Sequence, residues 1–111
     1  MHPVYRVIFH IDEEDKWPLL LGNVKNLLAS QDLAEIEVVA NAAAVAAYQS
    51  KEFVTQMTDL NGQGVQFVAC QNALNAQHIS KEDLLKFVSV VPAGIVELVK
   101  KQNSGYVYIK P

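Results

Sequence analysis

The sequence has only one cysteine, Cys70, among its 111 residues. One cysteine excludes a disulfide within the chain and a zinc site built from several cysteines. The histidines His2, His10 and His78 lack metal-ligand spacing, so we expect no bound metal. The chain also lacks an apolar run of membrane-spanning length and a basic segment followed by an apolar stretch. We therefore expect no membrane association, no signal peptide and a cytoplasmic location.

Basic charge is scarce, with a formal net charge of -3 and no cluster of lysine or arginine. A nucleic-acid partner is therefore not expected. The strongest charged run is acidic, Asp12 to Asp15. It could bind a divalent cation, but a solvated loop before a helix is the favoured interpretation, because negative charge is favourable at a helix start. Half of the residues are hydrophobic, which predicts one compact domain over residues 1–111 with some surface covered by another subunit.

Strand-like and helix-like segments alternate along the whole chain. Strands are predicted where β-branched and aromatic residues gather, at 4–11, 35–40, 65–70, 87–91 and 106–109. Helical spacing or capping residues predict helices between them. This alternation predicts an α/β fold, a doubly wound five-stranded parallel sheet with helices on both faces. The simplest order is the flavodoxin-like 2-1-3-4-5.

Candidate functional side chains stand at the carboxyl ends of the first three predicted strands. Ligands gather at the carboxyl ends of parallel strands, and these ends carry His10, Asn41 and Cys70. A thiol at the start of the next helix lies near positive amide dipoles that favour the thiolate. Cys70 can instead be a small buried hydrophobe. His10 can assist a sulfur anion or merely end a strand, and Asn41 can position a ligand or support a turn.

Two amides come directly after the cysteine. Gln71 and Asn72 can offer hydrogen-bond donors to a ligand or satisfy turn backbone groups. No serine-hydrolase or phosphate-loop pattern occurs, and Gly62-Gln63-Gly64 precedes a strand instead of following one. We expect no cofactor.

Several segments together resemble the DsrE/DsrF-like family of small proteins linked to sulfur relay. The more specific ones are Gly64-Val65-Gln66-Phe67-Val68-Ala69-Cys70-Gln71-Asn72-Ala73-Leu74 and the C-terminal Gln-x-x-Gly-Tyr-x-Tyr-Ile-x-Pro pattern from Gln102 to Pro111. Weaker matches include Val7 to Ile11, Asn23 to Leu28, Ile36 to Ala40 and Val90 to Leu98. The resemblance implies a doubly wound domain that assembles as a homotrimer or hexamer. It also implies that Cys70 holds sulfur as a persulfide, passed between donor and acceptor proteins.

One position departs from the family pattern. Relatives often carry a His-Gly pair after the second strand, where this chain has Asn41-Ala42. Asparagine donates hydrogen bonds but does not act as a base near neutral pH. Two functions therefore remain open. One is a sulfur carrier acting through Cys70, and the other is a binding or scaffolding oligomer with an unreactive cysteine.

Overall fold

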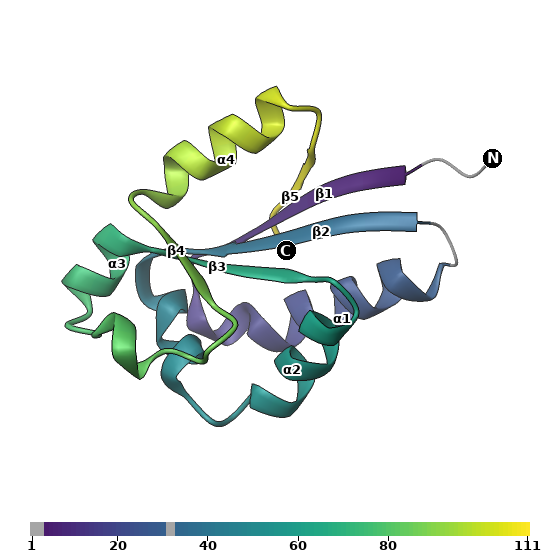
Figure 1. The fold of residues 1–111 in the computed structure, drawn as a ribbon. Coiled ribbons are helices and arrows are strands. Elements are labelled where there is room, and N and C mark those ends of the chain that lie inside the picture. The colour runs from purple at the N-terminus through teal and green to yellow at the C-terminus, as the bar shows by residue number, and fades with distance from the viewer. Residues whose placement is uncertain (1–3, 31–32) are drawn as a thin grey trace.

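The computed structural model describes residues 4–30 and 33–111 as one sheet with helices around it (Figure 1). The strands are β1 (Val4–Ile11), β2 (Leu33–Ala40), β3 (Gln66–Cys70), β4 (Ser89–Val91) and β5 (Val107–Ile109). The α-helices are α1 (Trp17–Ala29), α2 (Val54–Gly62), α3 (Gln71–Ala76) and α4 (Gly94–Asn103). Three 3-10 helices complete the fold, η1 (Glu14–Lys16), η2 (Ala42–Gln49) and η3 (Lys81–Asp83). No helix among these residues combines the length and apolar character needed to cross a bilayer.

All strand pairs are parallel, which confirms the predicted fold class, but the strand order differs from the prediction. The order is β4-β3-β2-β1-β5 and not 2-1-3-4-5. β2, and not β1, is the central strand, and β3 pairs with it along Glu37 to Ala40. β5 pairs with the other side of β1 through only three residues, Val107 to Ile109. Hydrophobic patterning marks which segments are strands, but it does not say which strands are neighbours.

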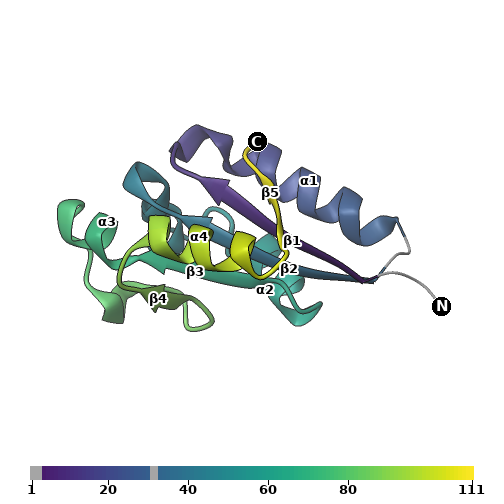
Figure 2. The ribbon, with the colours of Figure 1, turned by 90° about the horizontal axis from the view of Figure 1, so that it is seen from above.

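The layers follow from this order and from right-handed crossovers. The chain steps in one direction from β1 to β4, which keeps these connections on one face of the sheet. The return from β4 to β5 runs the opposite way and puts α4 on the other face. Figure 1 shows α1 and α2 below the sheet and α4 above it. Among the described elements, α4 is the only helix on its face, and Figure 2 shows it lying over the sheet.

The larger hydrophobic core lies between the sheet and α1, η2 and α2. Its largest side chains, Trp17 and Tyr48, pack edge to face with ring centroids 5.4 Å apart. The Trp17 indole Nε1–H donates to the Ala44 carbonyl oxygen at 2.9 Å. The Tyr48 hydroxyl donates to the Val68 carbonyl oxygen at 3.1 Å. These two bonds attach the alanine-rich η2 to α1 and to the sheet.

Local signals predicted some elements too long. Ser80 to Asp83 suggests a capping box that opens a helix, but only the single 3-10 turn η3 forms there. The Ser80 hydroxyl hydrogen-bonds the Glu82 carboxylate instead of a backbone N–H. The strand predicted at 87–91 is shortened to Ser89–Val91. Because the two side chains bond each other, neither caps the backbone N–H groups that a longer helix would leave unpaired.

Candidate functional site

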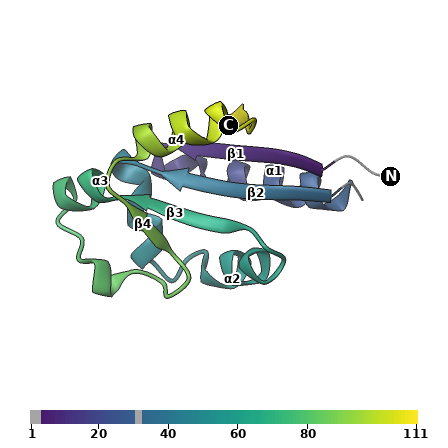
Figure 3. The same cartoon turned by 45° about the horizontal axis from the view of Figure 1, so that its top comes forward.

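The carboxyl ends of β1, β2 and β3 lie side by side in the sheet, as Figure 3 shows for the three strands. His10 is near the end of β1, Asn41 directly follows β2, and Cys70 is the last residue of β3. Because β2 is central, Asn41 stands between the other two. In the order 2-1-3, His10 would have taken this middle position. The strand order thus makes Asn41 the nearer neighbour of Cys70.

His10 is held from both sides by hydrogen bonds. Its Nε2 lies 3.0 Å from Asn41 Oδ1, and its Nδ1 lies 2.7 Å from the Tyr108 hydroxyl. With Oδ1 as the acceptor, the Nε2–H donates to Asn41 and Nδ1 accepts from Tyr108. Both ring nitrogens are therefore occupied, so His10 orients Asn41 instead of facing an open space.

Tyr108 is a member of this group that the sequence did not reveal. It lies on β5, and its register partner on β1 is Ile8. The predicted order put β5 at the far edge of the sheet, away from His10. The only available signal was its place in the C-terminal Gly-Tyr-x-Tyr pattern.

Cys70 lies at the end of β3, next to β4, and the connections that follow these two strands run to opposite faces of the sheet. After β3, α3 packs against η2, whereas α4 follows β4 onto the other face. Such a switch point is the usual place for a ligand in an open α/β sheet. The thiol is free and buried, with 7% of the residue exposed. Access to the sulfur in this structure is therefore narrow.

The first residue of α4, Gly94, brings the helix into direct contact with this edge. A β-carbon on Gly94 would lie 3.3 Å from the Cys70 β-carbon and 3.5 Å from that of Asn41. The absence of a side chain therefore allows the N-terminus of α4 to approach both residues. The unpaired N–H groups of a helix start carry partial positive charge. Cys70 thus lies beside the positive end of a ten-residue helix.

The turn after Asn41 holds a strained alanine. Ala42 has φ 48°, a left-handed conformation that costs alanine roughly 1 kcal/mol and glycine almost nothing. The Asn41 N–H donates to the Ile11 carbonyl oxygen, and its own carbonyl oxygen accepts from the Ala44 N–H. These backbone bonds and the Trp17 contact keep the turn in place. This left-handed turn, which would suit a glycine, is therefore held here by an alanine.

The two amides after the cysteine lie in the first turn of α3. Gln71 Nε2 donates to Asn75 Oδ1 at 2.9 Å within α3, and Asn72 is exposed. His78 is exposed as well, and His2 lies outside the described residues. The structure thus brings His10, Asn41, Tyr108 and Cys70 to one edge, while Gln71 bonds along its own helix.

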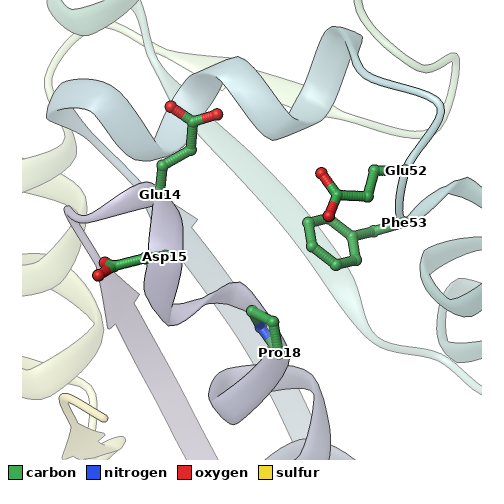
Figure 4. Close-up of a pocket in the computed structure, with 5 residues that line it drawn as sticks. All are labelled: Glu14, Asp15, Pro18, Glu52 and Phe53. Carbon is green, nitrogen blue, oxygen red and sulfur yellow. The ribbon is translucent and has the colours of Figure 1, made fainter.

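The acidic loop borders a separate depression of about 290 Å³ lined by Glu14, Asp15, Pro18, Glu52 and Phe53. Figure 4 shows Glu14 and Asp15 pointing in different directions. Asp12, at the start of this loop, pairs with Lys110 at 3.2 Å. Within the described part of the chain, no three acidic, histidine or cysteine side chains are grouped to hold a metal.

A buried carboxyl group on the α4 face was missed by the sequence analysis. Glu37, in β2, is 3% exposed, and its Oε1 lies 3.5 Å from Lys101 Nζ. The pKa of Glu37 is raised from 4.5 to about 8, mainly by burial and then by the neighbouring Glu97, while Lys101 opposes the shift. A glutamate inside a central strand was the available signal, but the apolar neighbours Ile36 and Val38 dominated the pattern.

Comparison with known proteins gives one family and several structural matches. The DsrE/DsrF-like family model matches residues 23–111. MTH1491, a protein of unknown function from Methanobacterium thermoautotrophicum, is 42% identical with a TM-score of 0.91, covering 96% of this chain and 99% of that one. The ychN protein of E. coli is 16% identical with a TM-score of 0.76 over 100% of both chains. BT1422, a conserved protein of unknown function from Bacteroides thetaiotaomicron, is 14% identical with a TM-score of 0.77, covering 96% of this chain and 94% of that one.

None of the curated proteins compared with the chain matches it. The two neighbours below 25% identity support the fold alone, whereas the family model spans most of the chain and includes Cys70 and Tyr108. The chain belongs to the DsrE/DsrF-like family.

Proposed function

We propose that this protein is a sulfur carrier that holds sulfur as a persulfide on Cys70. The proposal rests above all on the position of Cys70, at the switch point of the sheet and against the N-terminus of α4. Membership in a family linked to sulfur relay is consistent with it. A lone free cysteine fits a cytoplasmic protein, because thiols are kept reduced there.

The transfer needs no cofactor and no net oxidation. The Cys70 thiolate attacks the outer sulfur of a donor persulfide. The donor S–S bond breaks, its electron pair leaves with the donor thiolate, and a new S–S bond forms on Cys70. An acceptor thiolate then attacks the outer sulfur and releases the Cys70 thiolate.

Asn41 and the start of α4 have the supporting roles in this proposal. His10 engages the side-chain oxygen Oδ1 of Asn41, which leaves the side-chain Nδ2 amide group of Asn41 available as a donor. The α4 amide dipoles favour a sulfur anion beside Gly94. His10 and Tyr108 are thus positioning residues that act through Asn41.

The alternative function is a binding or scaffolding oligomer with an unreactive cysteine. The observation that favours it is the burial of Cys70, with 7% of the residue exposed. In that case the same edge would hold a small anion or a partner protein, and the thiol would serve as a small core residue.

Exposure of the purified protein to glutathione persulfide separates the two functions. We expect the intact mass to rise by one sulfur atom and to return after treatment with dithiothreitol. Because Cys70 is the only cysteine, Cys70→Ser should abolish the adduct completely. Asn41→Ala should slow its formation about tenfold, the loss of one hydrogen bond to an anion. Gln71→Ala is the matched control and should not change the rate.

A contrary result is equally clear. A folded protein that forms no adduct, and whose thiol reacts with iodoacetamide only after unfolding, is the scaffold and not the carrier. Mass spectrometry of the folded protein after treatment with iodoacetamide measures whether the Cys70 thiol has been alkylated.

We further propose that the protein assembles with itself as a homotrimer or hexamer. Apolar side chains are exposed on the outer side of α4, namely Ile95, Val96 and Val99, and at the β1 and β5 edge, namely Val4, Tyr5, Val107 and Tyr108. An exposed apolar patch of this kind is typical of a subunit interface.

Light scattering should give three or six times the mass of one chain at micromolar concentration. Val99→Glu, which adds a charge at a residue that is 61% exposed, should dissociate the assembly without unfolding the chain. Leu19→Glu, at an exposed position on α1, is the control and should leave the assembly intact. A monomer in the unaltered protein would contradict this assembly.

A further inference from the structure

Glu37 is a buried carboxyl group with one oxygen unused. It lies in the middle of β2, between Ile8 of β1 and Gln66 of β3, on the face that α4 covers. Lys101 approaches only Oε1, at 3.5 Å. Oε2 is buried and has no hydrogen-bond partner among the described residues. An unsatisfied buried carboxylate oxygen is costly, and such groups call for a missing partner.

A cavity of about 290 Å³ opens beside this carboxyl group. Its lining combines apolar and polar groups, namely Ala34, Glu35, Ile36, Glu37, Gly64, Gln66 and Tyr106. The volume suits a ligand or side chain of a few heavy atoms. The cavity lies toward the amino ends of β2 and β3, whereas Cys70 ends β3, so the two sites are separate.

The charges around Glu37 define what the cavity can hold. Glu35 is already paired with Arg6 at 3.5 Å. Lys101 is attracted to both Glu37 and Glu97, so two carboxyl groups share one ammonium group. When both are ionised, one negative charge has no partner. Tyr106 lends an aromatic ring, which already has Lys101 Nζ 5.2 Å from its centroid.

We propose that this cavity binds a small organic monocation, a guanidinium or ammonium group on a short apolar stem, with its charge against the free oxygen of Glu37. The apolar lining and the Tyr106 ring would receive the stem. The carboxyl group would supply the charge and the hydrogen-bond acceptor. This inference is independent of the sulfur chemistry proposed for Cys70.

Protonation of Glu37 should control the binding. The charged groups facing Glu37 are Glu97 and Lys101 of α4, with Glu35, Arg6, Tyr106 and the Tyr48 hydroxyl farther out. Because burial and the neighbouring Glu97 raise the pKa of Glu37 to about 8, the carboxyl group is mostly neutral at pH 6 and must lose its proton to pair with the cation. Affinity should therefore rise about tenfold per pH unit below that value and then level off.

Calorimetric titration with butylguanidinium tests the proposal, because its charge is constant across this range. We expect binding to strengthen roughly 50-fold or more from about pH 6 to pH 8.5, with no binding of the neutral butylurea. Glu37→Gln keeps the shape of the side chain and should remove both the binding and its pH dependence. Glu35→Gln removes a carboxylate at the rim and should keep the pH dependence. Equal affinity at both pH values, or unchanged binding in Glu37→Gln, would overturn the proposal.

The cation could be a free molecule or a basic side chain of a second copy. Carbon-13 NMR of the Glu37 carboxyl group, followed across pH at several protein concentrations, distinguishes these sources. A pKa that falls as the protein assembles, without binding of butylguanidinium, identifies a neighbouring chain. A pKa that falls only on addition of butylguanidinium identifies a free ligand. A pKa that responds to neither shows that no cation is bound there.

Discussion

Replacing Glu37 by glutamine should remove most of the loss of stability that the protein shows between about pH 4.5 and pH 8. The folded state holds the Glu37 proton up to about pH 8, whereas the unfolded chain releases it near 4.5. The folded state therefore binds more protons across this window, and the free energy of unfolding falls as pH rises. The stabilisation is complete below the unfolded pKa and is lost through the folded one. At about 1.4 kcal/mol per pKa unit, the difference amounts to roughly 3–5 kcal/mol.

Urea unfolding of both proteins at several pH values measures this effect. The quantity to compare is the difference between the two curves, because other carboxyl groups contribute equally to each. Glu35→Gln is the matched control, since Glu35 is exposed and its ion pair with Arg6 is at the surface. That variant should keep the slope of the parent. Parallel curves for Glu37→Gln and the parent would show that Glu37 is ionised in the folded state at neutral pH.

Trp17→Phe should lower the free energy of unfolding by about 3 kcal/mol. Trp17 is fully buried, and the smaller ring leaves a cavity against Tyr48. The larger part of the cost comes from the lost hydrogen bond, because the buried Ala44 carbonyl oxygen no longer accepts from the indole N–H at 2.9 Å. The Ala44 N–H in turn bonds the Asn41 carbonyl oxygen, so the change also loosens the turn that holds the candidate site.

Thermal unfolding followed by circular dichroism measures this loss. Leu19→Ala is the control, because Leu19 is on the same helix but 50% exposed, and it should cost under about 0.5 kcal/mol. A Trp17→Phe variant as stable as the parent would mean that η2 is held without the indole bond.

The sequence predicted which segments form strands better than it predicted which strands are neighbours in the sheet. The runs from Val4 to Ile11 and from Gln66 to Cys70 could be recognised as strands, because β-branched and aromatic side chains are favoured in buried strands. Strand order depends instead on which edge accepts the next strand. The three-residue β5 carries almost no such information, so its place beside β1 could not be read from the chain.

For the candidate site too, the sequence predicted which strand ends carry the residues but not how those residues are arranged. In either strand order, the ends of β1, β2 and β3 are neighbours, so the grouping of His10, Asn41 and Cys70 did not depend on the order. Which residue stands between the others did depend on it. Tyr108 and Glu37 were missed because each acquires its role only through a distant segment, β5 against β1 and α4 above β2.

The two faces of the sheet are covered by hydrophobic clusters of different size, and this difference determines which helix detaches from the sheet first. α4 is attached mainly by the small cluster of Ile8, Val39, Val68 and Leu98, whereas α1 and η2 belong to the much larger core. Segments with few buried contacts have the lowest free energy of local unfolding. In a single chain, we therefore expect α4 to detach from the sheet at a lower cost than α1 or η2. That one event uncovers the thiol at one end of the helix and the buried carboxyl group at the other, so solvent reaches both by the same motion.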